Sequence, residues 1–131
     1  MNRKDFDDYL DKFNNRDYQG FLNYYADKFE LIHVIFGGAL RTRDEVLKFY
    51  AFLHHYLKET VIVDHFVSDD KMVAIEARVR IQGLVDLTPE VIAASDYPKV
   101  KPLMAGQVLE IPHFIHYHIV NGKFVRVECR E

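Results

Sequence analysis

The sequence predicts an α+β fold for one domain spanning residues 1–131, in which helices cover one face of a curved, mostly antiparallel sheet. Three observations lead to this prediction. Apolar residues recur at helical spacing in the first part of the chain. From Glu59 onward they alternate with a period of two, and an Asn-Gly turn joins the last two extended segments. With 131 residues the chain can bury one core or enclose a small pocket.

Two short helices are expected first. Each has apolar residues three and four apart, which form a single stripe on a helix. Asn14-Asn15-Arg16 separates the two, and Asp17 can cap the second one. The stripes are Phe6, Tyr9, Leu10 and Phe13 in the first helix, and Tyr18, Phe21, Leu22 and Tyr25 in the second.

A third helix is predicted after Thr42-Arg43-Asp44-Glu45, which reads as a capping box, with the Thr42 hydroxyl and the Glu45 carboxylate satisfying free amides at the helix start. Because the helix dipole favours positive charge in the last turns, we interpret His54 and His55 as a solvated or dipole-stabilised pair. The expected buried face is Val46, Phe49, Tyr50, Leu53 and Leu57.

The extended segments follow from β-branched and aromatic content and from alternation. We predict strands at 29–36 (ended by Gly37-Gly38), at 61–67, at 72–81, at 107–120 and at 123–130. Residues 84–106 hold three of the four prolines and lack a sustained period. We predict a loop there, with one short helix after Pro89, and a loop of this length is commonly a lid or binding loop over the mouth of a pocket.

Side-chain alternation separates the three histidines of the segment IPHFIHYHIV. His113 shares a face with apolar residues and should point toward the helices, whereas His116 and His118 should point outward. The outward pair could supply two metal ligands, with a third from a glutamate on a neighbouring strand. Arginines occupy the same face, so we predict no metal site and expect cross-strand charge pairs, partly buried by a partner subunit.

The inward face carries more polar side chains than a hydrophobic core requires. His33, His65 and His113 are each predicted to point inward from a different strand, and Tyr9 and Tyr117 are available beside them. A single buried histidine is usually a core residue with a satisfied hydrogen bond. Three converging histidines favour a polar pocket, which we predict.

Composition excludes several classes of function. The net charge is −3 and the basic residues are scattered, so we expect no nucleic-acid partner. No apolar run is long enough to span a membrane, and the charged N-terminal segment does not resemble a signal peptide. The single cysteine, Cys129, suits a reducing compartment, so we expect a cytoplasmic protein. Without a phosphate-binding glycine motif we also expect no cofactor.

The segments YLDKFNNRDYQGFLNYYADKFELIHVIFGG, RTRDEVLKFY and HYHIVNGKFVRV resemble the NTF2-like superfamily, and most of all its branch of SnoaL-like proteins, ketosteroid isomerases and scytalone dehydratases. The resemblance covers nearly the whole chain except residues 84–106. It implies a cone-shaped curved sheet closed by three helices (a cystatin-like α+β barrel), usually dimeric through the outer face of the sheet.

The same resemblance suggests site residues. The oxyanion tyrosine of the isomerases falls on Tyr9, their carboxylate base on His33, and their second oxyanion acid on Ile115. The histidine that the dehydratases carry in their first long strand, followed by Phe, falls on His65-Phe66. Their pocket asparagine falls on His113, while Ile81-Gln82-Gly83 stands where their second histidine would be.

We therefore predict a cofactor-independent isomerase, cyclase or dehydratase that acts by general acid–base catalysis on a small apolar carbonyl or hydroxy compound. Two other readings stay open: a non-catalytic ligand-binding or dimerisation module, and an accessory subunit that docks through its charged outer face. The predicted catalytic residues are Tyr9, His33, His65 and His113, and the predicted substrate-binding residues are Phe13, Phe49, Val63, Ile75, Val79, Ile115 and Tyr117.

Overall fold

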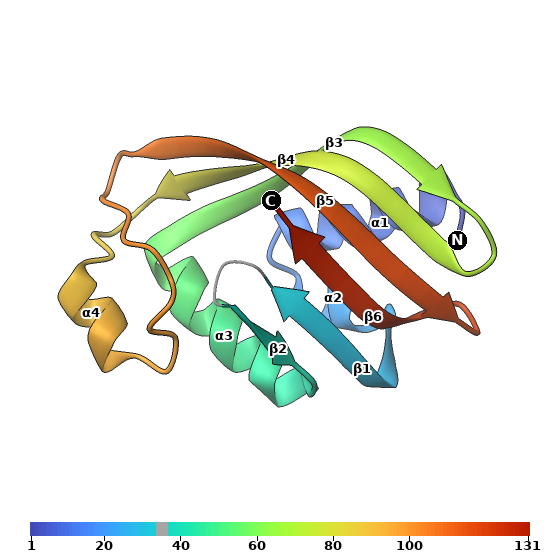
Figure 1. The fold of residues 1–131 in the computed structure, drawn as a ribbon, viewed down its shortest axis with the longest axis horizontal. Coiled ribbons are helices and arrows are strands. Elements are labelled where there is room, and N and C mark those ends of the chain that lie inside the picture. The colour runs from blue at the N-terminus through green and yellow to red at the C-terminus, as the bar shows by residue number, and fades with distance from the viewer. Residues whose placement is uncertain (34–36) are drawn as a thin grey trace.

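The computed structural model describes residues 1–33 and 37–131, and it confirms the α+β class (Figure 1). Residues 34–36 of the first predicted strand lie outside the described residues. The elements in chain order are α1 (Arg3–Asn14), α2 (Tyr18–Leu22), β1 (Tyr25–His33), β2 (Gly38–Leu40), α3 (Arg43–Tyr56), β3 (Leu57–Ser68), β4 (Met72–Gly83), α4 (Pro89–Ala94), β5 (Val108–Val120) and β6 (Lys123–Arg130).

The described strands form one sheet in the order β2-β1-β6-β5-β4-β3. Neighbouring strands are antiparallel except β1 and β6, which pair in parallel. The sheet is strongly curved but not closed, and α1, α2 and α3 lie within its curve (Figure 1). The predicted cone is therefore present, with its concave face directed at the helices.

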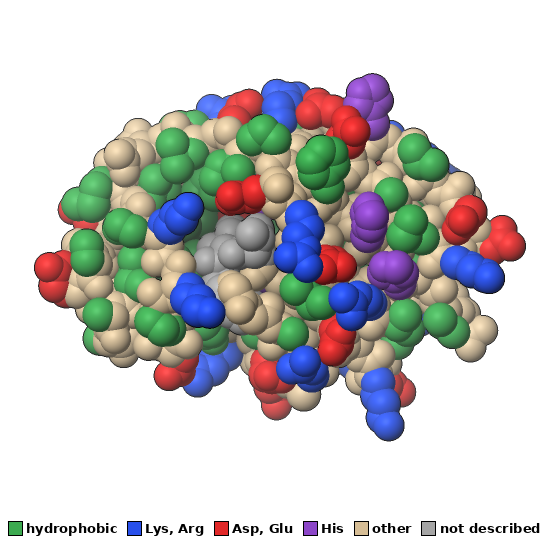
Figure 2. All heavy atoms as spheres, viewed as in Figure 1, with side chains coloured by type: hydrophobic (Ala, Val, Ile, Leu, Met, Phe, Trp, Pro, Cys, Tyr) green, Lys and Arg blue, Asp and Glu red, His purple; other side chains and the backbone are tan. Residues whose placement is uncertain are grey.

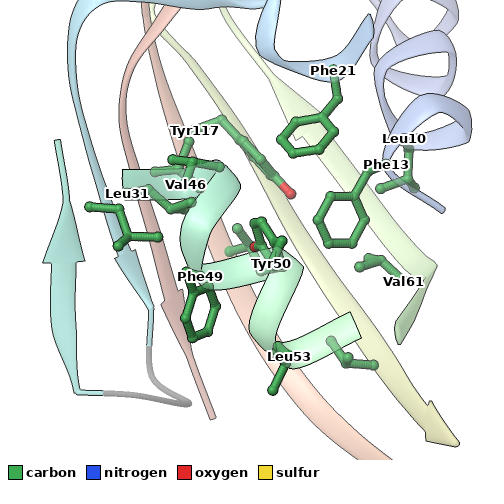
Figure 3. Close-up of a cluster of buried hydrophobic side chains, with 14 of the residues drawn as sticks. Leu10, Phe13, Phe21, Leu31, Val46, Phe49, Tyr50, Leu53, Val61 and Tyr117 are labelled. Atoms are coloured by element: carbon green, nitrogen blue, oxygen red, sulfur yellow. The ribbon is translucent and has the colours of Figure 1, made fainter. Parts of the chain in front are cut away.

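The core fills the space between these helices and the concave face. Phe6 of α1 and Phe49 of α3 are fully buried, as is Phe124 of β6. Figure 3 shows Phe13, Phe21 and Tyr50 facing one another across this space. Burying each of these aromatic side chains contributes roughly 2–3 kcal/mol, so the helices and the sheet hold each other in place.

The helix starts follow the predicted capping, with one difference. The Thr42 hydroxyl accepts a hydrogen bond from the Glu45 amide at 3.1 Å, and the Glu45 carboxylate accepts one from the amide of Arg41 at 3.1 Å instead of that of Thr42. The prediction for α2 was too long. This helix ends at Leu22, and Tyr25 already belongs to β1, where it pairs with Phe124 of β6.

A β-bulge overturns the predicted orientation of His65. Val63 pairs with Ala77 and the next pair is His65 with Glu76, so Asp64 is an extra residue in β3. The extra residue reverses the alternation beyond it. His65 and Val67 consequently lie on the exposed outer face, whereas Phe66 turns inward onto Phe6, with 5.5 Å between the ring centroids.

The outer face of the sheet carries the predicted charge pairs. Arg78 contacts Asp64 at 3.0 Å and Glu110 at 3.3 Å, and Arg126 contacts Glu30 at 3.0 Å. Phe114 is 51% exposed on this face. Figure 2 shows acidic, basic and histidine side chains interspersed there with hydrophobic ones.

Two segments differ in detail from the prediction. Gly38 begins β2, which pairs with β1, so the glycine pair does not simply end the strand. Within 84–106, α4 begins at Pro89 as predicted, and a bridge between Leu87 and Leu103 closes the loop. Among the described helices, none combines the length and the hydrophobicity needed to cross a bilayer.

Candidate active site

The concave face and the helices enclose an inner cavity of about 40 Å³. A cavity of this size holds on the order of one or two water molecules. It would therefore accept only one end of an organic ligand. Side chains from α1, α3 and five strands line it: Tyr9, Leu10, Phe13, Tyr25, Leu31, His33, Tyr50, Glu59, Val61, Val79, His113, Ile115, Tyr117, Val127 and Cys129.

A carboxylate stands at one side of this cavity. Glu59 of β3 is only 4% exposed, and its Oε1 lies 2.9 Å from Nε2 of His54, which is 5% exposed in α3. Burial raises the pKa of Glu59, but the hydrogen bond with His54 is the largest effect that lowers it, and the pKa lies below its ordinary value. Glu59 is therefore ionised and accepts a hydrogen bond from His54 Nε2–H.

A second contact fixes the His54 ring. Its Nδ1 lies 2.8 Å from the hydroxyl of Tyr18, at the start of α2. The ring also stacks on Tyr18 and packs against Tyr50, with centroids 5.9 and 4.8 Å away. With Nε2–H directed at Glu59, Nδ1 is the ring atom that forms the hydrogen bond with the Tyr18 hydroxyl. Glu59, His54 and Tyr18 thus form one hydrogen-bonded chain from the cavity to the half-buried Tyr18.

The sequence contains the signals for Glu59 and His54, although the sequence analysis missed both. Glu59 is two residues before Val61, so it shares the inward phase of β3. His54 lies four residues after Tyr50 and therefore on the buried stripe of α3. The interpretation of His54 as solvated or dipole-stabilised was wrong, while His55 is exposed as expected.

Two further histidines face the same cavity. His33 ends the described part of β1 and packs against Phe49 with 5.4 Å between ring centroids. Burial lowers the pKa of His33, which keeps its imidazole neutral at neutral pH. His113 of β5 is 3% exposed, and its Nδ1 lies 3.0 Å from the carbonyl oxygen of Ile111. Because a carbonyl oxygen can only accept a hydrogen bond, that contact assigns Nδ1 as the donor.

Tyrosine hydroxyls form the other side of the cavity. The hydroxyl oxygens of Tyr9 and Tyr25 are 3.3 Å apart, and Tyr50 and Tyr117 also line the space. Burial raises the pKa of all four phenols well above neutrality, so each keeps its proton and can donate a hydrogen bond. Burial also raises the pKa of the Cys129 thiol to about 12, which leaves this side chain protonated and a poor nucleophile.

The structure brings most of the predicted site residues together. Tyr9, His33 and His113 line the cavity, as do the predicted binding residues Phe13, Val79, Ile115 and Tyr117. Three other predicted binding residues, Phe49, Val63 and Ile75, pack in or against the core. They line neither this inner cavity nor a second, outer cavity on the same strands. His65 lies outside because of the bulge at Asp64.

An outer cavity of about 200 Å³ lies beyond the inner one along the same strands. On β3 the lining passes from Glu59 to Leu57, and on β5 from His113 to Ile111. The other lining residues are Leu53, Ile81, Lys99, Val100, Lys101, Pro102, Leu103, Leu109 and Glu131. In Figure 2 a hollow with a hydrophobic interior and basic side chains nearby is visible left of centre.

The site offers proton transfer more readily than metal chemistry. Across residues 1–33 and 37–131, no group of three or more His, Cys, Asp or Glu side chains is arranged to hold a metal ion. The cavity instead combines the ionised Glu59 carboxylate, the neutral His33 imidazole and protonated phenols. These groups can accept, donate and stabilise charge at a carbonyl compound.

Residues 6–127 match the family model described as the SnoaL-like domain. Comparison with curated proteins finds no match. Solved structures with the same fold include an NTF2-like protein of unknown function from Burkholderia pseudomallei K96243, with TM-score 0.73, 16% identity, and coverage of 95% of this chain and 86% of that one. A candidate polyketide cyclase from Pseudomonas putida KT2440 gives TM-score 0.72, 21% identity, and coverage of 96% and 87%.

A third structure, a protein with a ketosteroid isomerase-like fold from Catenulispora acidiphila DSM 44928 in complex with trimethylamine, gives TM-score 0.74 and 8% identity and covers 100% of this chain and 87% of that one. At these identities the three structures establish a shared fold.

Proposed function

Because the chain belongs to the SnoaL-like domain family, we propose that it is a cofactor-independent acid–base enzyme of the isomerase, cyclase or dehydratase type. The substrate is a small apolar carbonyl or hydroxy compound. The observation that carries this proposal is the buried Glu59 carboxylate, which faces the inner cavity and is held at 2.9 Å by His54. The Pseudomonas putida structure with the same fold, a candidate polyketide cyclase, supports the same class of reaction.

Glu59 acts as the general base in this proposal. Its carboxylate removes a proton from the carbon next to the substrate carbonyl, and the electron pair moves onto the carbonyl oxygen. Tyr9 donates a hydrogen bond to that oxygen as its negative charge develops. His33 and His113, which line the same cavity, orient the substrate or return the proton. His54 holds the carboxylate in position and keeps it ionised, and Tyr18 fixes the His54 ring.

Burial strengthens each of these interactions, because hydrogen bonds and charges are screened less away from water. A positioned general base contributes about 10²–10⁴-fold to a rate. Removing one donor to an oxyanion costs about 10²–10³-fold. We therefore expect Glu59→Gln and Tyr9→Phe each to lower kcat by these factors while changing substrate affinity little.

The test measures proton abstraction directly. Each member of a panel of apolar ketones and hydroxy-ketones is incubated with the protein in D₂O, and NMR follows deuterium uptake at the carbon next to the carbonyl. The wild-type protein should accelerate uptake for a subset, and Glu59→Gln should lose that acceleration. His65→Ala is the matched control, because His65 lies on the outer face and should be dispensable. Equal uptake by wild type and Glu59→Gln would disprove the role of Glu59.

A non-catalytic ligand-binding module is the alternative on the same fold. It would bind members of the panel without accelerating deuterium uptake in any of them. Calorimetric titration of the same compounds therefore separates binding from catalysis.

We also propose that the protein forms a homodimer through the outer face of its sheet, and that it acts in the cytoplasm, a reducing compartment suited to its single cysteine. Support for the dimer comes from Phe114, which is 51% exposed between charged side chains. Light scattering on the wild type and on Phe114→Asp tests the dimer. A monomeric wild type, or a dimeric variant, would contradict it.

A further inference from the structure

The outer cavity carries charge only at its rim. Its walls are aliphatic side chains of α3, β3, β4, β5 and the segment 100–103, and its charged lining residues are Lys99, Lys101 and Glu131. We propose that this cavity binds the apolar body of an amphipathic carboxylate, whose anionic group lies between Lys99 and Lys101. The inference rests on the proposed function in one respect: the bound carboxylate is the substrate whose carbonyl end reaches Glu59.

The two lysines are available for an anionic ligand. Both are exposed, and neither forms an ion pair with any residue in 1–33 or 37–131, unlike Lys48, which contacts Asp96 at 2.6 Å. Two positive charges face one negative charge at the rim, in a chain whose net charge is −3. The rim is thus locally positive on a protein that is negative overall, which favours an anionic ligand over a cationic one.

The alkyl stem of Lys99 lies close to the backbone of Gly37. The position that a Cβ would take on Gly37 is 3.0 Å from Cδ of Lys99 and 3.6 Å from its Nζ. Gly37 also has a φ of +68°, a conformation that side chains disfavour. The absence of a side chain therefore lets the alkyl stem of Lys99 lie against the backbone, with its ammonium group at the rim.

The distance between the two cavities sets the length of the ligand. Leu109 lines the outer cavity and His113 the inner one, and four residues of a strand cover about 13 Å. A molecule with its reactive carbonyl at Glu59 and its carboxylate at the rim spans roughly that distance. The inner cavity is too small for the body of such a molecule, and the outer one offers a larger, mostly apolar space.

Binding of two matched probes tests this inference without turnover. Decanoate and 1-decanol differ in the charge of one end and are titrated separately, at low ionic strength, by displacement of a fluorescent apolar probe. We expect wild-type protein to bind decanoate more tightly than decanol. The double variant Lys99→Gln/Lys101→Gln should weaken decanoate binding by about fivefold, as two exposed charge contacts would, and leave decanol unchanged.

Two controls complete the experiment. Lys28→Gln/Lys71→Gln changes the net charge equally at positions that do not line the cavity and should leave both affinities unaltered. Ile111→Trp places a large ring in the outer cavity and should abolish binding of both probes. Equal wild-type affinities, an unaffected lysine double variant, or full binding by Ile111→Trp would each overturn the inference. Glu59→Gln should still bind decanoate, so a failed catalytic test leaves this result standing.

Discussion

The pair formed by Glu59 and His54 makes a quantitative prediction about stability. His54→Phe keeps an aromatic ring of similar size between Tyr18 and Tyr50 but removes the N–H donor from a carboxylate that is 4% exposed. The abandoned Glu59 then either stays ionised without a partner or takes up a proton. Leaving a buried carboxylate without its partner in this way costs about 3–5 kcal/mol.

Proton uptake limits that cost. Protonating a carboxyl group with an ordinary pKa of 4.5 at pH 7 requires about 3.4 kcal/mol relative to the unfolded chain. We therefore expect His54→Phe to lower the free energy of unfolding by about 3 kcal/mol. With a urea dependence of about 2 kcal/mol per molar, the unfolding midpoint should fall by roughly 1.5 M. The exposed neighbour provides the control, and His55→Phe should change stability by less than about 0.5 kcal/mol.

A double-mutant cycle distinguishes loss of the pair from loss of packing. Glu59→Gln removes the charge, so His54→Phe in that background leaves no buried carboxylate behind. The double variant should consequently be much more stable than the sum of the two single effects implies, with a coupling of about 2 kcal/mol. Effects that add within about 0.5 kcal/mol would refute the reasoning, because they would mean that the two side chains do not depend on each other.

Four further predictions concern stability and are measured by urea unfolding. Because burial lowers the pKa of His33, the unfolded chain binds more protons than the folded one below pH 6.5, so the free energy of unfolding should fall as the pH drops from about 7 to about 5.5. His33→Gln should flatten this slope, and equal slopes for the variant and the wild type would contradict the prediction. Thr42→Ala should cost about 1 kcal/mol and Thr42→Ser much less, since the hydroxyl caps α3. Phe6→Ala should lower the free energy of unfolding by about 3–5 kcal/mol, whereas Val67→Ala, on the exposed face of β3 beyond the bulge, should lower it by less than about 0.5 kcal/mol. Similar losses for the two variants would argue against the register described for β3. Tyr18→Phe should cost about 1 kcal/mol through loss of its hydrogen bond to His54, and an unchanged midpoint would count against that bond.

Much of the fold could be predicted because hydrophobic period is a local property. The stripes of α1 and α3 and the alternation in β4 and β5 read directly from the sequence, and the inward placement of His113 followed from the same rule. The parallel pairing of β1 with β6 could not be obtained in this way. It joins segments far apart in the chain, and no local pattern records which distant edge a strand meets.

Some residues of the candidate site could be predicted from local sequence patterns and others could not. His33 and His113 were found because each interrupts an apolar face, and Tyr9 because it matches the oxyanion tyrosine of the isomerases that the chain resembles. Alternation along β3 also predicted an inward orientation for His65. The extra residue Asp64 reverses the orientation of the side chains that follow it, and such an insertion leaves no signal in the periodicity. Glu59 was missed for a different reason. Its spacing of two residues from Val61 gives the inward phase, but glutamate is rarely buried unless it is paired, and its partner His54 was interpreted as solvated or dipole-stabilised.

The place of β6 in the sheet has a consequence for how the chain reaches its native state. β6 follows the other five described strands of the sheet in the chain and is synthesised after them, yet it sits between β1 and β5. Until residues 123–130 emerge, β1 and β2 have no edge to join, so the early hairpin must wait while the rest of the chain is translated. Amide exchange on ribosome-bound chains should therefore show β1 unprotected until β6 is released, and early protection of β1 would contradict this order of events.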